Sequence, residues 1–159
     1  MSIAAGSPQS PAPVRATRDD LADPVRAALG APPEPTWRTV HAAGIPFAAR
    51  EWGDGGRPVL LVHGITSSSA VWWRLGPALA AGLGRRVIAV DQAGHGRTGQ
   101  WTGHHRFVDN AADIAAFARA AGIDGPDLRV VGHSWGAMTA AALPAAGLVP
   151  AAPVPPHPP

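Results

Sequence analysis

Three short apolar runs constrain this sequence most, because each ends in a polar, glycine-containing turn and is followed by a helix-like segment. The runs are Pro58–Val62, Arg86–Val90 and Leu128–Val131. Continuous apolar runs of this length are typical of strands buried on both faces. Strands that alternate with helices form mostly parallel sheets covered on both sides. The pattern therefore predicts an α/β fold built on a mostly parallel sheet with helices on both faces.

The segments around these runs divide the chain into three predicted regions. Residues 1–35 read as an N-terminal extension, partly disordered, which ends in a proline cluster that stops a short helix. Residues 36–148 form the predicted α/β domain, and residues 149–159 form a proline-rich tail that cannot be a sheet strand. The other expected strands are Thr36–Ala42 and Phe47–Trp52, and the expected helices are Asp19–Leu29, Ala70–Ala81, Phe107–Ala118 and the alanine-rich segment that ends at Leu143.

Composition excludes several classes of function. The chain has no cysteine, which excludes disulfides, thiolate metal sites and a cysteine nucleophile. The isoelectric point of about 10.9 reflects arginine without lysine or tyrosine, while the net charge is only +2. Because the arginines are scattered, we expect no nucleic-acid surface. No signal sequence and no apolar run of about 20 residues is visible, so we expect a cytoplasmic protein without a membrane partner.

The third apolar run leads into the most informative motif, Gly132-His133-Ser134-Trp135-Gly136. A nucleophile placed on a sharp strand-to-helix turn needs small residues two positions before and two positions after it, because larger side chains would collide. The preceding strand and the following helix provide that context, so we predict Ser134 to be a catalytic nucleophile. The alternative is a glycine-rich turn whose serine only caps the helix.

Two backbone amides are candidates for an oxyanion hole. The amide of Trp135 lies at a predicted helix N-terminus, where N–H groups favour negative charge. The amide of Ile65 follows the first apolar run in His63-Gly64-Ile65, where Gly64 lets the backbone pass closely. The side chain of His63 is expected to be structural, because the group needed here is a main-chain donor.

The loop after the second apolar run carries polar residues that we interpret as structural. It reads Asp91-Gln92-Ala93-Gly94-His95-Gly96-Arg97-Thr98, with glycines at alternate positions. Asp91, His95 and Arg97 are expected to hydrogen-bond within the loop. His95 as a general base is an alternative that no spacing selects.

Two pairs of neighbouring residues could be taken for parts of a binding site. His104-His105 is expected to lie in a solvated loop, because two adjacent histidines do not make a metal site without further ligands. Trp72 and Trp73 are expected to pack in the core, with the lining of an apolar acyl pocket as the alternative.

Together, the three motifs resemble the α/β-hydrolase superfamily. His63-Gly64-Ile65 is similar to its oxyanion turn, Asp91–Thr98 to its D-x-x-G-H-G-x-[ST] loop and Gly132–Gly136 to its nucleophile elbow. The resemblance covers roughly residues 36–148. It implies that Ser134 is the nucleophile of an ester-like hydrolysis through an acyl-enzyme, without a cofactor. The serine argues against the haloalkane dehalogenase and epoxide hydrolase branches, which use aspartate there.

The sequence departs from this pattern after the elbow. The superfamily triad continues with an acid and then a histidine, yet no Asp or Glu follows Ser134 and the only later histidine is His157, among prolines. We therefore expect a truncated N-terminal portion of the fold, without the later strands and the cap, and with little or no turnover. The alternative is a non-catalytic fragment that associates through the exposed edge of the Leu128–Val131 strand.

Overall fold

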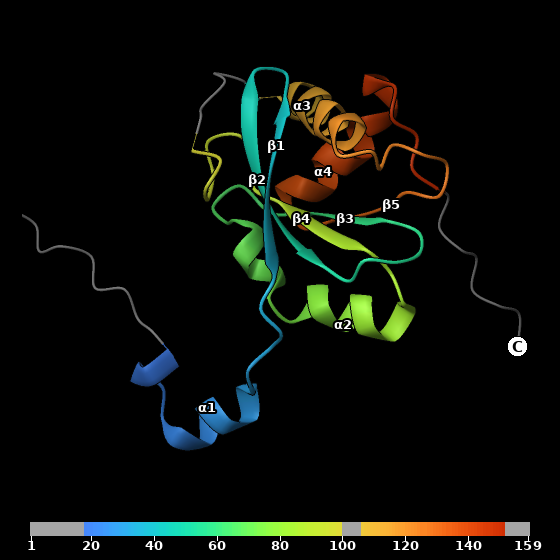
Figure 1. The fold of residues 1–159 in the computed structure, drawn as a ribbon. Helices are drawn as coiled ribbons and strands as arrows, with labels where there is room; N and C mark the ends of the chain where they lie inside the picture. The colour runs from blue at the N-terminus through green and yellow to red at the C-terminus, as the bar shows by residue number, and fades with distance from the viewer. Residues whose placement is uncertain (1–17, 100–105, 152–159) are drawn as a thin grey trace, which may run out of the picture. The chain divides into compact units, whose positions relative to one another are not determined.

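The computed structural model describes residues 18–99 and 106–151 and divides the chain into two units that meet after Ala31. The first unit holds a 3₁₀ turn, Arg18–Asp20, and helix α1, Asp23–Leu29 (Figure 1). The single helix expected over Asp19–Leu29 is therefore wrong in its first turn. Pro24 falls at the start of α1, where its missing N–H removes no helical hydrogen bond.

The second unit is built on a five-stranded sheet in the order β1-β2-β4-β3-β5 (Figure 1). Strands β4, β3 and β5 run parallel, whereas β1 pairs with β2 and β2 with β4 in antiparallel fashion. The parallel part is thus the part predicted from the three apolar runs. The strands are β1 Thr36–Ala42, β2 Ile45–Trp52, β3 Val59–Val62, β4 Val87–Val90 and β5 Arg129–Gly132.

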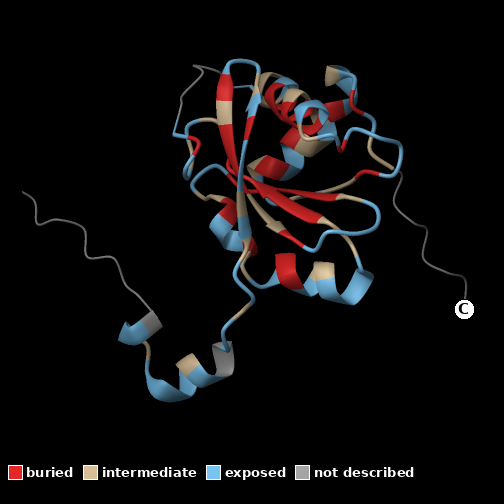
Figure 2. Ribbon diagram, viewed as in Figure 1, coloured by how far each residue is buried: buried red, intermediate tan, exposed pale blue. Residues whose placement is uncertain are grey.

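Helices cover both faces of the sheet, as predicted. One face packs on α3 (Phe107–Ala120), α4 (Trp135–Ala142) and the 3₁₀ turn η3 (Leu143–Ala146). The other face packs on η2 (Ser69–Trp72) and α2 (Leu75–Leu83). Alternate residues of each central strand enter the two cores, and the central strands form the buried layer in Figure 2.

The helix expected over Ala70–Ala81 is instead a 3₁₀ turn followed by a separate helix, η2 and α2. Two of the apolar residues that suggested its inner face, Val71 and Leu75, are exposed. The buried contact is made by Gly76, because a Cβ there would lie 2.4 Å from the Trp52 ring. The missing side chain lets the indole pack against α2, which a search for apolar spacing cannot detect.

In the described residues, β5 forms one edge of the sheet and β1 forms the other. The expected double burial of β5 is wrong, since no residue of β5 is fully buried and Val131 is 38% exposed. Arg129 and His133 donate to carbonyls of the β3 side, so Val130 and Gly132 direct their backbone groups away from β3. The edge expected from the sequence is therefore present, but it is short.

Several predictions concern residues outside this description. The proline-rich segment with His157 and the His104-His105 pair lie among residues that the structure does not describe. Among residues 18–99 and 106–151, no helix is long and apolar enough to cross a membrane. The cytoplasmic location stays a prediction.

Candidate functional site

Ser134 is one of two described non-glycine residues with a positive φ, the other being Ala43. Strand β5 ends at Gly132 and α4 begins at Trp135, so the chain reverses direction within two residues. Ser134 makes this turn with φ 52° and ψ −121°, a region that L-residues rarely adopt. A conformation of this kind costs about 1–3 kcal/mol and persists only where its surroundings hold it in place. Its side chain is exposed and makes no capping hydrogen bond.

Two glycines hold this turn by their lack of side chains. A Cβ on Gly132 would lie 2.3 Å from the Gly136 carbonyl oxygen, and one on Gly136 would lie 2.2 Å from the Val62 carbonyl oxygen. Both distances are far below van der Waals contact between carbon and oxygen. Any larger residue at either position would have to push β5 and α4 apart, or α4 away from β3.

Hydrogen bonds fix the same turn to the sheet. The His133 N–H donates to the Val62 carbonyl at 3.0 Å, and the Gly136 N–H donates to the His133 carbonyl at 2.9 Å. The Ala137 N–H donates to the Ser134 carbonyl at 2.8 Å. The chain on both sides of the serine is therefore bonded, while Ser134 itself is exposed.

The turn after β3 lies against the elbow. Gly64 and Ser67 close a β-turn with a 3.1 Å hydrogen bond, which places Ile65 at its first central position. A Cβ built on Gly64 would lie 3.3 Å from the Ser134 Cβ, so the two turns are in contact. Among the described residues, neither the Ile65 nor the Trp135 N–H donates a hydrogen bond. Two free amides next to one serine can stabilise a developing oxyanion.

His63 is buried below this turn and is satisfied at both ring nitrogens. Its Nε2 accepts from the Gln92 N–H at 3.0 Å, so its Nδ1 carries the proton and donates to the Gly64 carbonyl at 2.7 Å. Burial lowers the pKa of His63, because the charged ring would lose its hydration. A neutral ring with both nitrogens bonded fits the structural role predicted for His63, and this role stays a prediction.

The Asp91–Thr98 loop is held by its own polar groups. The Asp91 carboxylate accepts the Ser69 N–H at 2.6 Å and the Arg97 N–H at 2.9 Å. The Thr98 hydroxyl donates to the Asp91 carbonyl at 2.6 Å and accepts the Ala48 N–H at 3.0 Å. Asp91 thus joins the loop to η2, and Thr98 joins it to β2.

His95 connects the loop to the candidate oxyanion turn. Its Nδ1 lies 2.9 Å from the Ala93 carbonyl, and its Nε2 bonds the Ile65 carbonyl. The ring also lies 5.1 Å from the His63 ring, centre to centre. Because both nitrogens face backbone carbonyls, His95 positions the Ile65 peptide and is not placed as a base for Ser134.

Trp72 lies in the core, whereas Trp135 lies at the candidate site. Trp72 is buried in the core on the α2 side, as expected, while Trp73 is partly exposed with the Arg74 guanidinium 5.3 Å from its ring centre. Trp135 packs against the Phe107 ring at 4.3 Å. The sequence predicts Phe107 only as part of a helix, because no spacing in the sequence links it to the elbow.

Among residues 135–151, which the structure describes after the serine, no side chain can act as a base or an acid for Ser134. No Asp or Glu comes after position 134, and the described part of that segment, 135–151, contains no histidine. In the described ranges, no cluster of three His, Asp or Glu side chains is placed to hold a metal ion. The site therefore combines a positioned hydroxyl with two free amides.

Comparison with known proteins places this geometry in a family. The family model of the alpha/beta hydrolase fold matches residues 57–150, more than half of the chain. Epoxide hydrolase B of Mycobacterium tuberculosis is 37% identical over 84 residues, which cover 52% of this chain and 23% of that protein. A bifunctional esterase/perhydrolase of Acinetobacter calcoaceticus is 35% identical over 95 residues, 58% of this chain and 33% of that protein.

Solved structures give the same result. An epoxide hydrolase from Vigna radiata superimposes with a TM-score of 0.62 at 29% identity, covering 69% of this chain and 35% of that one. The chain thus spans about a third or less of the length of the relatives it matches. Fold, elbow and family model agree, and the chain belongs to the alpha/beta hydrolase fold family.

Proposed function

We propose that this chain carries the nucleophile and the oxyanion hole of a serine hydrolase that cleaves an ester-like bond through an acyl-enzyme. The observation that carries the proposal is the Ser134 backbone, held at φ 52° between two glycines that admit no side chain. Such a turn exposes the hydroxyl at the N-terminal end of α4, where helix N–H groups favour an anion.

The steps follow from the positions of the groups. The Ser134 Oγ attacks the carbonyl carbon while its proton passes to a base, and the carbonyl oxygen becomes an oxyanion that accepts from the Ile65 and Trp135 amides. Collapse of this intermediate breaks the ester bond while the base gives its proton to the leaving oxygen. The alcohol is released and an acyl group stays on Ser134. Water then hydrolyses the acyl-enzyme by the same route.

The residue at position 134 also bears on the choice of substrate. The relatives include an epoxide hydrolase and an esterase/perhydrolase, and a serine nucleophile fits attack on a carbonyl better than the opening of an epoxide. Because no Asp or Glu follows Ser134 and the only later histidine, His157, lies among prolines, we expect the 159-residue chain itself to show little turnover. Nucleic acid and membrane are not among its proposed partners.

Rescue by an external base tests the nucleophile separately from the missing triad. We expect added imidazole to accelerate p-nitrophenyl acetate hydrolysis by the chain above the rate with Ser134→Ala under identical conditions. Ser68→Ala, which removes a hydroxyl from the neighbouring turn, should behave like the unsubstituted chain. Equal rates for the chain and Ser134→Ala would remove Ser134 as the nucleophile. Rapid Ser134-dependent turnover without imidazole would show that the chain provides its own base.

A second candidate function, self-association, rests on the free edge of β5. Two backbone N–H groups, those of Val130 and Gly132, face away from β3, and such an edge can pair with another strand. Proline at position 130 removes an outward donor without removing a β3 hydrogen bond. We expect Val130→Pro to lower any self-association seen by sedimentation velocity. Association that persists at full strength in folded Val130→Pro would exclude this edge.

A further inference from the structure

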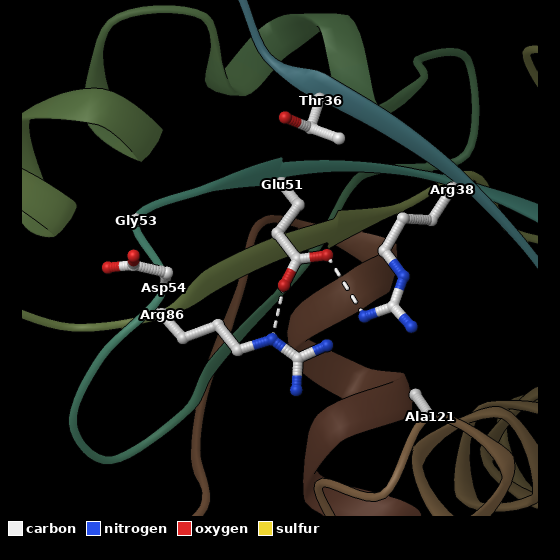
Figure 3. Close-up of a pocket in the computed structure, with 7 residues that line it drawn as sticks. All are labelled: Thr36, Arg38, Glu51, Gly53, Asp54, Arg86 and Ala121. Atoms are coloured by element: carbon white, nitrogen blue, oxygen red, sulfur yellow. Dashed lines mark hydrogen bonds and ion pairs between the residues drawn. The ribbon is translucent and has the colours of Figure 1, made fainter.

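A cavity of about 710 Å³ lies away from the elbow. It is bounded by β1, the C-terminal part of β2, the residue before β4 and the end of α3 (Figure 3). Its volume is in the range of small-molecule sites, about 300–1,000 Å³. The lining residues are Thr36, Arg38, Glu51, Gly53, Asp54, Arg86 and Ala121.

The cavity and the elbow lie at opposite ends of the parallel strands. Ser134 follows the C-terminal end of β5, whereas Arg86 precedes the N-terminal end of the parallel strand β4. Strand β4 has four residues, so these two ends of the parallel strands are roughly 13 Å apart at about 3.3 Å per residue. The cavity is therefore not part of the candidate hydrolase site.

One carboxylate organises the charges in this cavity. Glu51, whose side chain is 12% exposed, accepts from Arg38 Nη1 at 3.1 Å through one oxygen and from Arg86 Nε through the other. Two guanidinium groups thus share one carboxylate, which leaves the trio with a net charge of +1. Repulsion between the two cations is only partly compensated, so a second anion is favoured.

Both guanidinium groups keep donors for such an anion. Arg86 donates to Glu51 through Nε alone and Arg38 through Nη1 alone, and no other hydrogen bond from either joins it to a described residue. Figure 3 shows both groups between Glu51 and Ala121, with their remaining N–H groups turned into the cavity. The Asp54 carboxylate points away from them. Paired guanidinium donors match the geometry of carboxylate and phosphate oxygens.

The end of α3 does not oppose an anion strongly. Helix C-termini carry partial negative charge on unpaired carbonyls. Here the N–H groups of Ala121, Gly122 and Ile123 bond the carbonyls of residues 117, 119 and 118. With these carbonyls paired, the guanidinium groups dominate the charge at the cavity wall.

We propose that this cavity binds the oxyanion group of a small molecule, a phosphate or a carboxylate, between Arg38 and Arg86, with Glu51 positioning both side chains. The binding site is independent of the proposed hydrolase chemistry.

Calorimetric titration of the chain with inorganic phosphate, and separately with acetate, tests the proposal at constant ionic strength. We expect saturable phosphate binding that Arg38→Gln and Arg86→Gln each weaken by about tenfold or more, because each removes charge-assisted hydrogen bonds. Arg57→Gln is the matched control, since Arg57 pairs with Asp127 outside the cavity. Tighter binding of phosphate would identify phosphate-bearing ligands, and tighter binding of acetate would identify carboxylates.

Two results would overturn the proposal. One is no saturable binding of either anion by the folded chain at millimolar concentrations. The other is an equal loss of affinity in Arg57→Gln, which would show non-specific attraction to surface arginines. Should Arg86→Gln fail to fold, as judged by its thermal melt, Arg38→Gln decides the outcome, because the Arg38 side chain is 44% exposed and its loss is tolerated more easily.

Discussion

The same substitution at two helical glycines should have opposite effects on stability. Gly136 lies in the first turn of α4 and Gly82 in the last turn of α2. A Cβ on Gly136 would lie 2.2 Å from the Val62 carbonyl oxygen and 2.5 Å from that of His63, both rigid backbone atoms. A Cβ on Gly82 would have no heavy atom within 4 Å. We therefore expect Gly136→Ala to destabilise the fold and Gly82→Ala to stabilise it.

The magnitudes follow from these contacts. Overpacking of this kind costs about 1–3 kcal/mol, whereas replacing glycine by alanine in an open helical position gains about 0.5–1 kcal/mol. The two variants should then differ by about 1.5–4 kcal/mol in the free energy of unfolding. In a domain of this size, each kcal/mol corresponds to about 2–4 °C in the melting temperature.

Urea unfolding followed by circular dichroism measures the difference directly. Both variants have the same composition, so differences in the unfolded chain largely cancel. If Gly136→Ala were as stable as Gly82→Ala, the close packing of α4 on β3 would be refuted as the constraint that holds the elbow. The argument for a strained Ser134 would then lose its structural basis.

Three further predictions concern single side chains. Ser134→Gly should raise the free energy of unfolding by about 1 kcal/mol in urea titrations, because glycine adopts the observed φ of 52° without strain; Ser134→Ala should not. The pKa of His63 is lowered in the fold, so below about pH 6.5 the unfolded state binds more protons and the free energy of unfolding falls as the pH drops. Urea titrations at several pH values should show a weaker fall for His63→Asn than for His41→Gln, a control that alters an exposed histidine. Asp91→Asn turns an acceptor of a buried N–H into a donor and should cost about 1–3 kcal/mol by urea unfolding, whereas Asp124→Asn, at an exposed position, should be neutral.

The elements at the parallel part of the sheet were predictable because their signal is local. Each apolar run is short and continuous, and β3, β4 and β5 lie within a residue of the expected ends. The start of β2 is predicted less accurately, because the turn between β1 and β2 consists of Ala43 and Gly44 alone, both with positive φ. Strand β2 therefore begins at Ile45, two residues before the expected start.

The missed features arise from contacts between distant segments. The indole of Trp52 packs where Gly76 has no side chain, and nothing in the spacing of α2 indicates this. The cavity around Glu51 brings together Arg38, Glu51 and Arg86 from three strands or strand ends, and no motif connects positions 13 and 35 residues apart. The elbow could be predicted because its glycines lie only two positions before and after the serine in the sequence.

The contacts that force Ser134 into its conformation all lie between β3 and the start of α4, since Gly136 meets the carbonyl oxygens of Val62 and His63, and Gly132 meets the Gly136 carbonyl. The proposed nucleophile is thus held by contacts among β3, the end of β5 and the start of α4. For protein engineering this makes the segment from β3 to α4 a natural half of a split reporter. One polypeptide would carry the preformed serine turn, a second would supply a histidine and a carboxylate, and signal would report their reassembly.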